Sequence, residues 1–165
     1  MKFIDTHSHL YIEQFDKDRS KVITEAIANG VETILLPNIS SIYTKKMLAL
    51  CSEFPDNCYP MMGLHPCDVT EKNYDIEIAH VEEELAKGNY IGVGEIGLDL
   101  YWDKSTLEIQ KKAFIHQIKL AKKYELPIAI HVRDSFNEAI EIVESLNDQT
   151  LSGVFHCFTG NINDA

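Results

Sequence analysis

The sequence predicts an α/β fold in which parallel strands alternate with helices. Short apolar runs alternate with longer segments whose apolar residues recur at helical spacing. The runs are continuously apolar, which is typical of parallel strands that helices cover on both faces. Gly30, after the first helical segment, and Pro127, before the fifth run, mark loops that return the chain to the sheet.

This pattern gives five strand–helix units and a sixth strand. The strands, each predicted from one apolar run, are Phe3–Asp5, Val31–Leu36, Tyr59–Leu64, Ile91–Gly94, Ile128–Ile130 and Gly153–Phe155. The helices, each predicted from the periodic segment that follows a strand, are Lys17–Asn29, Ile42–Phe54, Ile76–Lys87, Thr106–Tyr124 and Phe136–Leu146. No low-complexity linker or shift of composition divides the chain, so we expect residues 1–165 to form a single domain.

Composition and charge restrict the classes of function. The chain has 165 residues, of which 45% are hydrophobic, and this is enough to bury a core without disulfides. Its net charge of -11 provides no broad basic face, which argues against tight, sequence-independent wrapping of duplex DNA. An anionic substrate that is small, or that is gripped only locally, is compatible with this charge.

Cysteine usage and the lack of long apolar runs predict a cytoplasmic protein. The cysteines form no CxxC pair and no regular framework, which favours reduced thiols that fill apolar space; they are Cys51, Cys58, Cys67 and Cys157. No apolar run is long enough to span a membrane, and the N-terminal MKFID turns polar too early for a signal peptide. We therefore expect no membrane association, and no feature predicts a protein partner.

Chemically versatile side chains follow nearly every predicted strand. They are His7, His9, His65, Glu95, His131 and His156. Enzymes built as βα barrels place their active sites at the carboxyl ends of the strands. In FIDTHSHL, the HxH spacing aims both imidazoles to the same side of an extended segment. An HxH pair alone fits two polar loop histidines equally well, but its recurrence with other ligands at strand ends favours a metal centre.

The remaining histidines have more ordinary interpretations. His80 and His116 fall within predicted helices, where a solvated helix face is the simpler explanation. His65, in GLHP, ends a strand beside Pro66. It could face the substrate or contact the metal ligands. Alternatively, it has a structural role in the loop.

Glu95 lies in VGEIGLD between Gly94 and Gly97. Small neighbours let the backbone approach a metal centre, and the two carboxylate oxygens could bridge two cations. The glycines could instead serve only a tight turn, but a charged carboxylate there needs a partner.

Polar residues near Glu95 and His131 could contact a substrate. Arg133, in IHVRD, has a planar guanidinium that suits phosphate oxygens, or it forms an ion pair with Asp134 or Asp99. Asp99 and Tyr101 could orient metal ligands or face substrate, or they could be ordinary loop residues.

These stretches together resemble the TatD family of metal-dependent deoxyribonucleases, within the amidohydrolase superfamily. The matching stretches, in the order of the family, are DTHSH, GLHP, GEIGLD, QKKAFIHQIKLAKKYELP, IHVRD and HCFTG. The resemblance runs through the whole chain. It implies a TIM-type (β/α)8 barrel and a hydrolase that acts on DNA, typically as a 3'-5' exonuclease on single-stranded or frayed ends.

The resemblance also implies a centre with one or two divalent metal ions. His7 and His9 would hold one metal, Glu95 would bridge, and His131 and His156 would hold the second. The histidine-rich ligand set suits zinc or manganese better than magnesium, yet nucleases often use magnesium supplied alongside the substrate phosphate. The choice among Mg, Mn and Zn stays open.

In the implied mechanism, the metals lower the pKa of a shared water that attacks the phosphorus. Arg133 would stabilise the extra charge of the transition state. His65 and Tyr101 could hold the nucleotide, with the ring of Tyr101 against a base.

The sequence departs from the family pattern at its C-terminus. The family closes with two further βα units and an aspartate in an ETD-like motif, which completes the first metal site and can act as general base. This sequence stops at GNINDA, and Asp164 lacks that motif context. Six strands cannot close such a barrel, whose usual length is about 250 residues. We therefore expect an N-terminal portion of a longer chain, truncated before the last two βα units and inactive or weakened alone.

Two other functions are compatible with these residues. The same metal centre could hydrolyse amide or ester bonds of small molecules. Alternatively, the chain could be a metal-binding fragment without catalysis. Replacement of Arg133 by alanine would separate the hydrolases, since only a phosphodiester substrate needs its charge.

Overall fold

The computed structural model describes residues 1–162. Its strands are β1 (Phe3–Asp5), β2 (Val31–Pro37), β3 (Cys58–Met61), β4 (Val93–Asp99), β5 (Ile128–Arg133) and β6 (Gly153–Phe155). Its α-helices are α1 (Arg19–Ala28), α2 (Ser41–Glu53), α3 (Tyr74–Lys87), α4 (Leu107–Lys123) and α5 (Phe136–Leu146). Short 3-10 helices occupy three loops, at η1 (Glu13–Phe15), η2 (Pro66–Asp68) and η3 (Lys104–Thr106). Every predicted strand and helix is therefore confirmed, while Asp164 lies outside the described residues.

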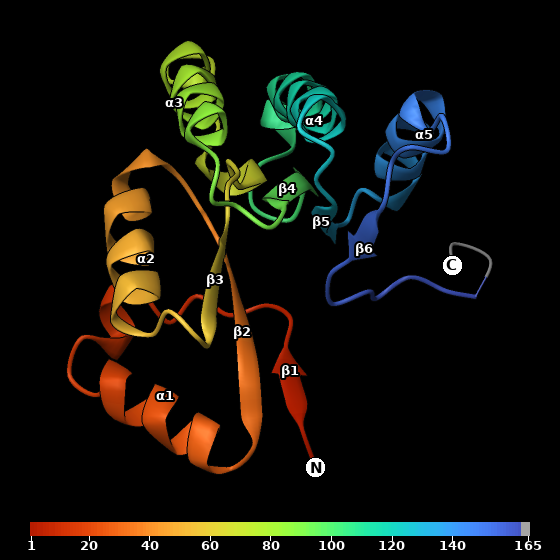
Figure 1. The fold of residues 1–165 in the computed structure, drawn as a ribbon. Coiled ribbons are helices and arrows are strands. Elements are labelled where there is room, and N and C mark those ends of the chain that lie inside the picture. Colours follow the sequence, from red (N-terminus) through yellow and green to blue (C-terminus); the bar gives the residue numbers. More distant parts are fainter. Residues whose placement is uncertain (163–165) are drawn as a thin grey trace.

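The strands are parallel and follow the order of the sequence. One sheet has the order β1-β2-β3 and the other β4-β5-β6. A parallel bridge between Met62 and Val93 joins them, and the main chain of Asn38 in turn bonds Gly94 and Glu95. Figure 1 shows the helices on the outside, the strands on the inside, and β1 and β6 at either side of an open face. This is the TIM-type arrangement over six strands.

Strand bounds differ from the prediction: β2, β4 and β5 extend further than the sequence predicts, and β3 ends at Met61 rather than at Leu64. Because β4 continues to Asp99 and β5 to Arg133, Glu95 and His131 lie inside strands rather than after them, which corrects the prediction. The reason is that the strands stay paired beyond these polar residues, with Leu98 opposite Val132. Every residue of β4 is buried, so Glu95 projects from the most enclosed strand of the molecule.

Helix α4 fixes the segment after β3 and the end of β4 through two buried glutamines. The side chain of Gln117 accepts a hydrogen bond from Leu64 N at 2.7 Å and donates to Leu64 O at 3.2 Å. Gln110 makes the same pair of bonds with the main chain of Asp99, at 2.8 and 2.9 Å. Both glutamines are almost fully buried, so these bonds replace strand pairing inside the core. They set the positions of His65, which follows Leu64, and of Asp99.

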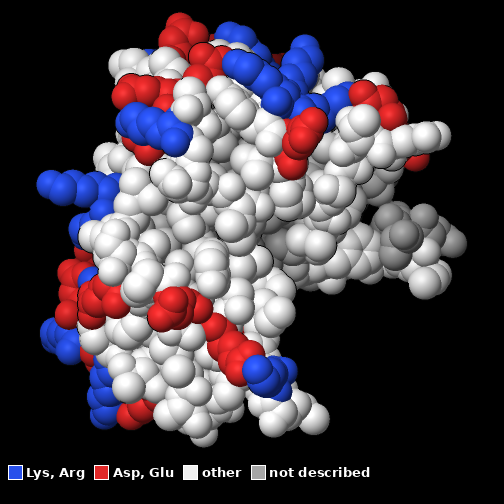
Figure 2. Space-filling model, viewed as in Figure 1, with Lys and Arg blue, Asp and Glu red and all other residues white. Residues whose placement is uncertain are grey.

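The surface divides into a charged outer face and a hollowed inner side. Lysines, arginines and acidic residues gather over the helices, while the hollowed side in Figure 2 is nearly free of them. The edge strands β1 and β6 expose Phe3, Ile4 and Val154. No helix in the described part of the chain is long and apolar enough to cross a membrane.

Candidate metal centre

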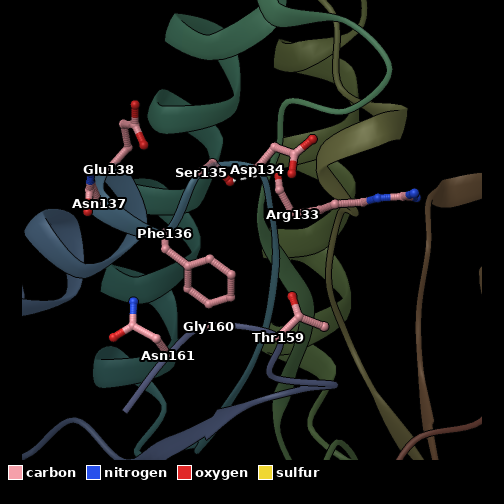
Figure 3. A pocket seen from close by; sticks show the side chains of 9 residues that line it. All are labelled: Arg133, Asp134, Ser135, Phe136, Asn137, Glu138, Thr159, Gly160 and Asn161. Atoms are coloured by element: carbon pink, nitrogen blue, oxygen red, sulfur yellow. Dashed lines mark hydrogen bonds between the residues drawn. The ribbon is translucent and has the colours of Figure 1, made fainter. Parts of the chain in front are cut away.

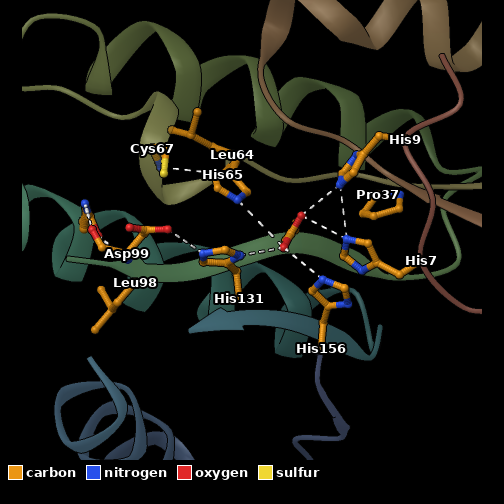
Figure 4. Close-up of polar contacts among 12 residues, drawn as sticks. His7, His9, Pro37, Leu64, His65, Cys67, Leu98, Asp99, His131 and His156 are labelled. Carbon is orange, nitrogen blue, oxygen red and sulfur yellow. Dashed lines mark hydrogen bonds and ion pairs between the residues drawn. The ribbon is translucent and has the colours of Figure 1, made fainter. Parts of the chain in front are cut away.

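Histidines from distant parts of the sequence converge on Glu95. Their rings point toward one another from the loops after β1, β3 and β6 and from β5 (Figure 4); they are His7, His9, His65, His131 and His156. Glu95 is only 2% exposed. The structure therefore brings together all of the residues predicted to bind metal.

One oxygen of Glu95 serves the HxH pair. The Oε2 atom lies 3.0 Å from His7 Nε2 and 3.1 Å from His9 Nε2, and these two nitrogens are 3.2 Å apart. The loop that presents them begins at Asp5, whose carboxylate accepts a hydrogen bond from His7 N at 3.1 Å. Asp5 thus shapes the turn rather than facing the cluster.

The other oxygen of Glu95 faces different histidines. The Oε1 atom lies 2.9 Å from His131 Nδ1, 3.8 Å from His65 Nε2 and 3.9 Å from His156 Nε2. The ring of His156 also stacks on the ring of His7, with centroids 3.5 Å apart. The carboxylate therefore has one oxygen for each of two ligand groups, as a bridging residue needs.

Two of the histidines, His9 and His131, are oriented by a partner on the ring nitrogen that faces away from Glu95. His9 Nδ1 lies 2.9 Å from the hydroxyl of Tyr11, which donates to Pro37 O at 2.6 Å. His131 Nε2 lies 2.9 Å from Asp99 Oδ2. With a metal bound, the Tyr11 hydroxyl would accept from His9 and the Asp99 carboxylate from His131, which would leave the lone pairs of the nitrogens that face Glu95 to the metal. Histidine ligands of metals are commonly held this way.

Sequence analysis left the role of Asp99 open and missed Tyr11. Spacing gives no signal for Tyr11, since residues 9–12 form a turn in which Ile12 N donates to His9 O at 3.1 Å.

In the neutral ring of His65, unlike the rings of His9 and His131, the nitrogen that faces away from Glu95 accepts a hydrogen bond. Its Nδ1 accepts a hydrogen bond from Cys67 N at 3.1 Å, so in the neutral ring the proton sits on Nε2, toward Glu95. Burial lowers the pKa of His65 to about 4, which keeps the ring neutral at pH 7. His65 can therefore donate a hydrogen bond into the centre.

The charge of the cluster calls for a cation. Burial alone would raise the pKa of Glu95, but hydrogen bonds from His131, His7 and His9 outweigh it and hold this pKa well below its usual range. Within residues 1–162, no lysine or arginine pairs with Glu95, and its partners are all imidazoles. A buried carboxylate ringed by imidazole nitrogens is a donor set that fits a divalent metal.

The donor atoms form two overlapping groups that could each hold a metal ion. One contains His7, His9 and Glu95, and the other contains His65, Glu95 and His131; within each, the donor atoms lie within 4.8 Å of one another. The first group is the predicted one. In the second, His65 stands nearer than the predicted His156, although its proton arrangement makes it the poorer ligand.

Arg133 is near this centre but outside the cluster. Its guanidinium carbon lies 3.5 Å from the centroid of the Tyr101 ring. In the described structure Arg133 forms no ion pair with Asp134 or Asp99, and Asp99 contacts His131 instead. In Figure 3 the side chain extends away from Phe136, at the start of α5.

His80 and His116 stay on the helices α3 and α4, as predicted. Each is partly buried and bonded to a neighbouring helix, His80 to Thr44 at 2.9 Å and His116 to Glu82 at 2.8 Å. They are therefore less solvated than the sequence analysis supposed, and they belong to helix packing.

Comparisons with known proteins bear on this centre. A family model described as TatD related DNase matches residues 4–165. A Bacillus subtilis protein named as the uncharacterized metal-dependent hydrolase YabD is 37% identical over 157 residues, which are 95% of this chain and 61% of that protein. A Pectobacterium carotovorum protein named 3'-5' ssDNA/RNA exonuclease TatD is 31% identical over 157 residues, 95% of this chain and 60% of that one.

Solved structures agree with this match. The crystal structure of YJJV, a TatD homolog from Escherichia coli, superposes with a TM-score of 0.88 at 30% identity, over 99% of this chain and 62% of that one. The chain thus spans about three-fifths of the length of these relatives.

Proposed function

Because this chain belongs to the TatD-related DNase family of metal-dependent hydrolases, we propose that its histidine cluster is a metal centre for phosphodiester hydrolysis. The proposed substrate is DNA, cleaved from the 3' end of single-stranded or frayed strands. The proposed metal ligands are His7, His9, Glu95, His131 and His156. The name of the Pectobacterium relative supports both the polarity and the single-stranded substrate.

One observation carries the proposal. The buried carboxylate of Glu95 divides its two oxygens between the HxH pair and His131. A bridging carboxylate is suited to hold two cations at close spacing, which is the arrangement that phosphodiester hydrolysis uses most often. When bound, the metal supplies Lewis acidity, which lowers the pKa of water and neutralises charge on the phosphoryl group.

The other residues orient the metal ligands or bind the substrate. Tyr11 and Asp99 hold the rings of His9 and His131 so that their lone pairs face the centre. His65 presents its Nε2 proton to an oxygen of the substrate, and Arg133 pairs with a phosphate. Hydrogen bonding from His131 lowers the pKa of Asp99 despite burial, so Asp99 stays ionised and orients His131.

Degradation of a 3'-labelled single-stranded oligonucleotide, with added Mg²⁺ or Mn²⁺, tests the proposal. The protein is compared with its Glu95→Gln variant, which keeps the shape of the side chain and removes its charge. Glu84→Gln is the matched control. Glu84, on α3, is also buried, but it forms a hydrogen bond with Tyr90 and an ion pair with Lys87. We expect cleavage to be lost only in Glu95→Gln, and equal activity of both variants would refute the proposal.

The rival substrate class is a small-molecule ester or amide. Arg133 has no carboxylate partner in the described structure, which favours an anionic substrate. Arg133→Ala should therefore slow cleavage of DNA far more than hydrolysis of a neutral ester. Equal losses on the two substrates would favour the small-molecule activity instead.

A further inference from the structure

We propose that Trp102, backed by Tyr101 and Arg133, is a stacking platform for one unpaired nucleobase beside the metal centre. The inference rests on the proposed function and adds a residue that neither the motifs nor the cluster around Glu95 points to. It makes single-strandedness a property that this loop recognises.

The platform is built from two exposed aromatic rings and one cation. Tyr101 is 52% exposed and Trp102 is 73% exposed, although both belong to the loop that follows the buried strand β4. Their rings meet edge to face, with centroids 4.8 Å apart and planes 89° apart. The guanidinium carbon of Arg133 lies 3.5 Å from the Tyr101 centroid and 5.9 Å from that of Trp102. Since Arg133 covers one face of Tyr101, Trp102 offers the freer surface.

The platform is tied to the centre by short bonds. Asp99 accepts a hydrogen bond from Tyr101 N through Oδ1 at 2.9 Å and contacts His131 through Oδ2 at 2.9 Å. Leu100 N donates to Arg133 O at 2.9 Å, which joins the loop to β5. These bonds join the loop that carries both rings to Asp99 and, through it, to His131.

The chemistry of the platform fits a nucleobase with its phosphate. Trp102 borders a hollow of about 160 Å³ whose other walls include Pro66, Val69 and Asp99, the residue that contacts His131. A flat ring can lie there against the indole, because every base has an aromatic face. Arg133, stacked and without a carboxylate partner in the described structure, can bind the adjoining phosphate. Bases inside a duplex are already stacked on both faces, so this site selects an unpaired one.

The experiment is a mutant cycle between the protein and the oligonucleotide. Binding of a fluorescent single-stranded oligothymidylate to the full-length protein is measured by anisotropy in EDTA, where cleavage is blocked. The same oligonucleotide is then made abasic at each position near its 3' end in turn. The variants are Trp102→Ala, Trp102→Phe and the control Tyr124→Ala. Tyr124 also has a cation over its ring, but it is partly buried against the core at the C-terminal end of α4.

We expect Trp102→Ala to weaken binding of the intact oligonucleotide about 5- to 150-fold, the loss that follows removal of one base–aromatic stack. Trp102→Phe should keep most of the affinity, and Tyr124→Ala should keep all of it. With an abasic site at the platform position, Trp102→Ala should cause no further loss.

Equal weakening on intact and abasic oligonucleotides, or no weakening at all, would overturn the platform. If the protein cleaves DNA but shows no such coupling, only the platform is wrong. Coupling without any cleavage in the presence of metal would leave the platform standing and refute the proposed nuclease.

Discussion

Tyr11→Phe tests whether the hydrogen bond between Tyr11 and His9 orients the His9 ring for metal binding. Tyr11 is fully buried, and its hydroxyl links His9 Nδ1 at 2.9 Å to Pro37 O at 2.6 Å. Phenylalanine fills the same space but leaves Pro37 O without this donor, which costs about 1–3 kcal/mol of unfolding free energy for a buried group. It also frees His9 to adopt the other tautomer, in which Nε2 has no lone pair for a metal.

Loss of such an orienting partner weakens metal affinity about 10- to 100-fold. The assay is competition for Mn²⁺ or Zn²⁺ against a chromophoric chelator, together with thermal denaturation. Tyr43→Phe is the matched control, because its ring lies 5.9 Å from that of Tyr11 while its hydroxyl has no hydrogen bond in the described structure. If Tyr11→Phe binds metal as tightly as Tyr43→Phe, the orienting role is refuted.

Two further predictions concern the strands that carry the centre. Gly97 has a φ of +141°, and an alanine Cβ there would collide with His131 O, so Gly97→Ala should lower the unfolding free energy by about 3 kcal/mol or more. Gly88→Ala, also at positive φ but with open space around it, should cost only about 1 kcal/mol in the same denaturant titration. Burial lowers the pKa of His131, but hydrogen bonds to Glu95 and Asp99 outweigh it and raise this pKa overall. Protonation therefore stabilises the metal-free fold below the unfolded pKa of about 6.5, and this stabilisation is lost as pH rises through the raised value. Because the lowered pKa values of His65 and His156 act in the opposite direction, the contribution of His131 is isolated by comparison with His131→Gln. In EDTA, the change in melting midpoint from about pH 6 to about pH 8.5 should be more negative in the protein than in His131→Gln, and equal changes in the two would contradict the prediction.

The sequence could predict the strands and helices because their signals are local. Continuous apolar runs mark strands that are buried on both faces, and the HxH spacing places His7 and His9 together without any tertiary information. Polar residues misled this local analysis at Glu95, which was taken to end a strand. It lies inside β4 because its histidine partners, contributed by other strands and loops, compensate its burial.

Contacts between strands and loops could not be predicted from spacing. The bond between His131 and Asp99 depends on the register of β4 and β5, in which Asp99 lies opposite Arg133. The stacking of Arg133 on Tyr101 likewise depends on the path of the loop after β4, whereas a charged neighbour in sequence suggested an ion pair. Such pairings follow from the assembled fold, not from any one segment.

The most direct test of the metal centre is anomalous X-ray scattering from crystals of the full-length protein soaked in Mn²⁺. The account predicts anomalous peaks on both sides of the Glu95 carboxylate, with one bound by His7 and His9 and the other by His131. Glu95→Gln crystals should lose at least one of these peaks. Peaks that lie away from Glu95, or a cluster that stays empty at saturating Mn²⁺, would contradict the account.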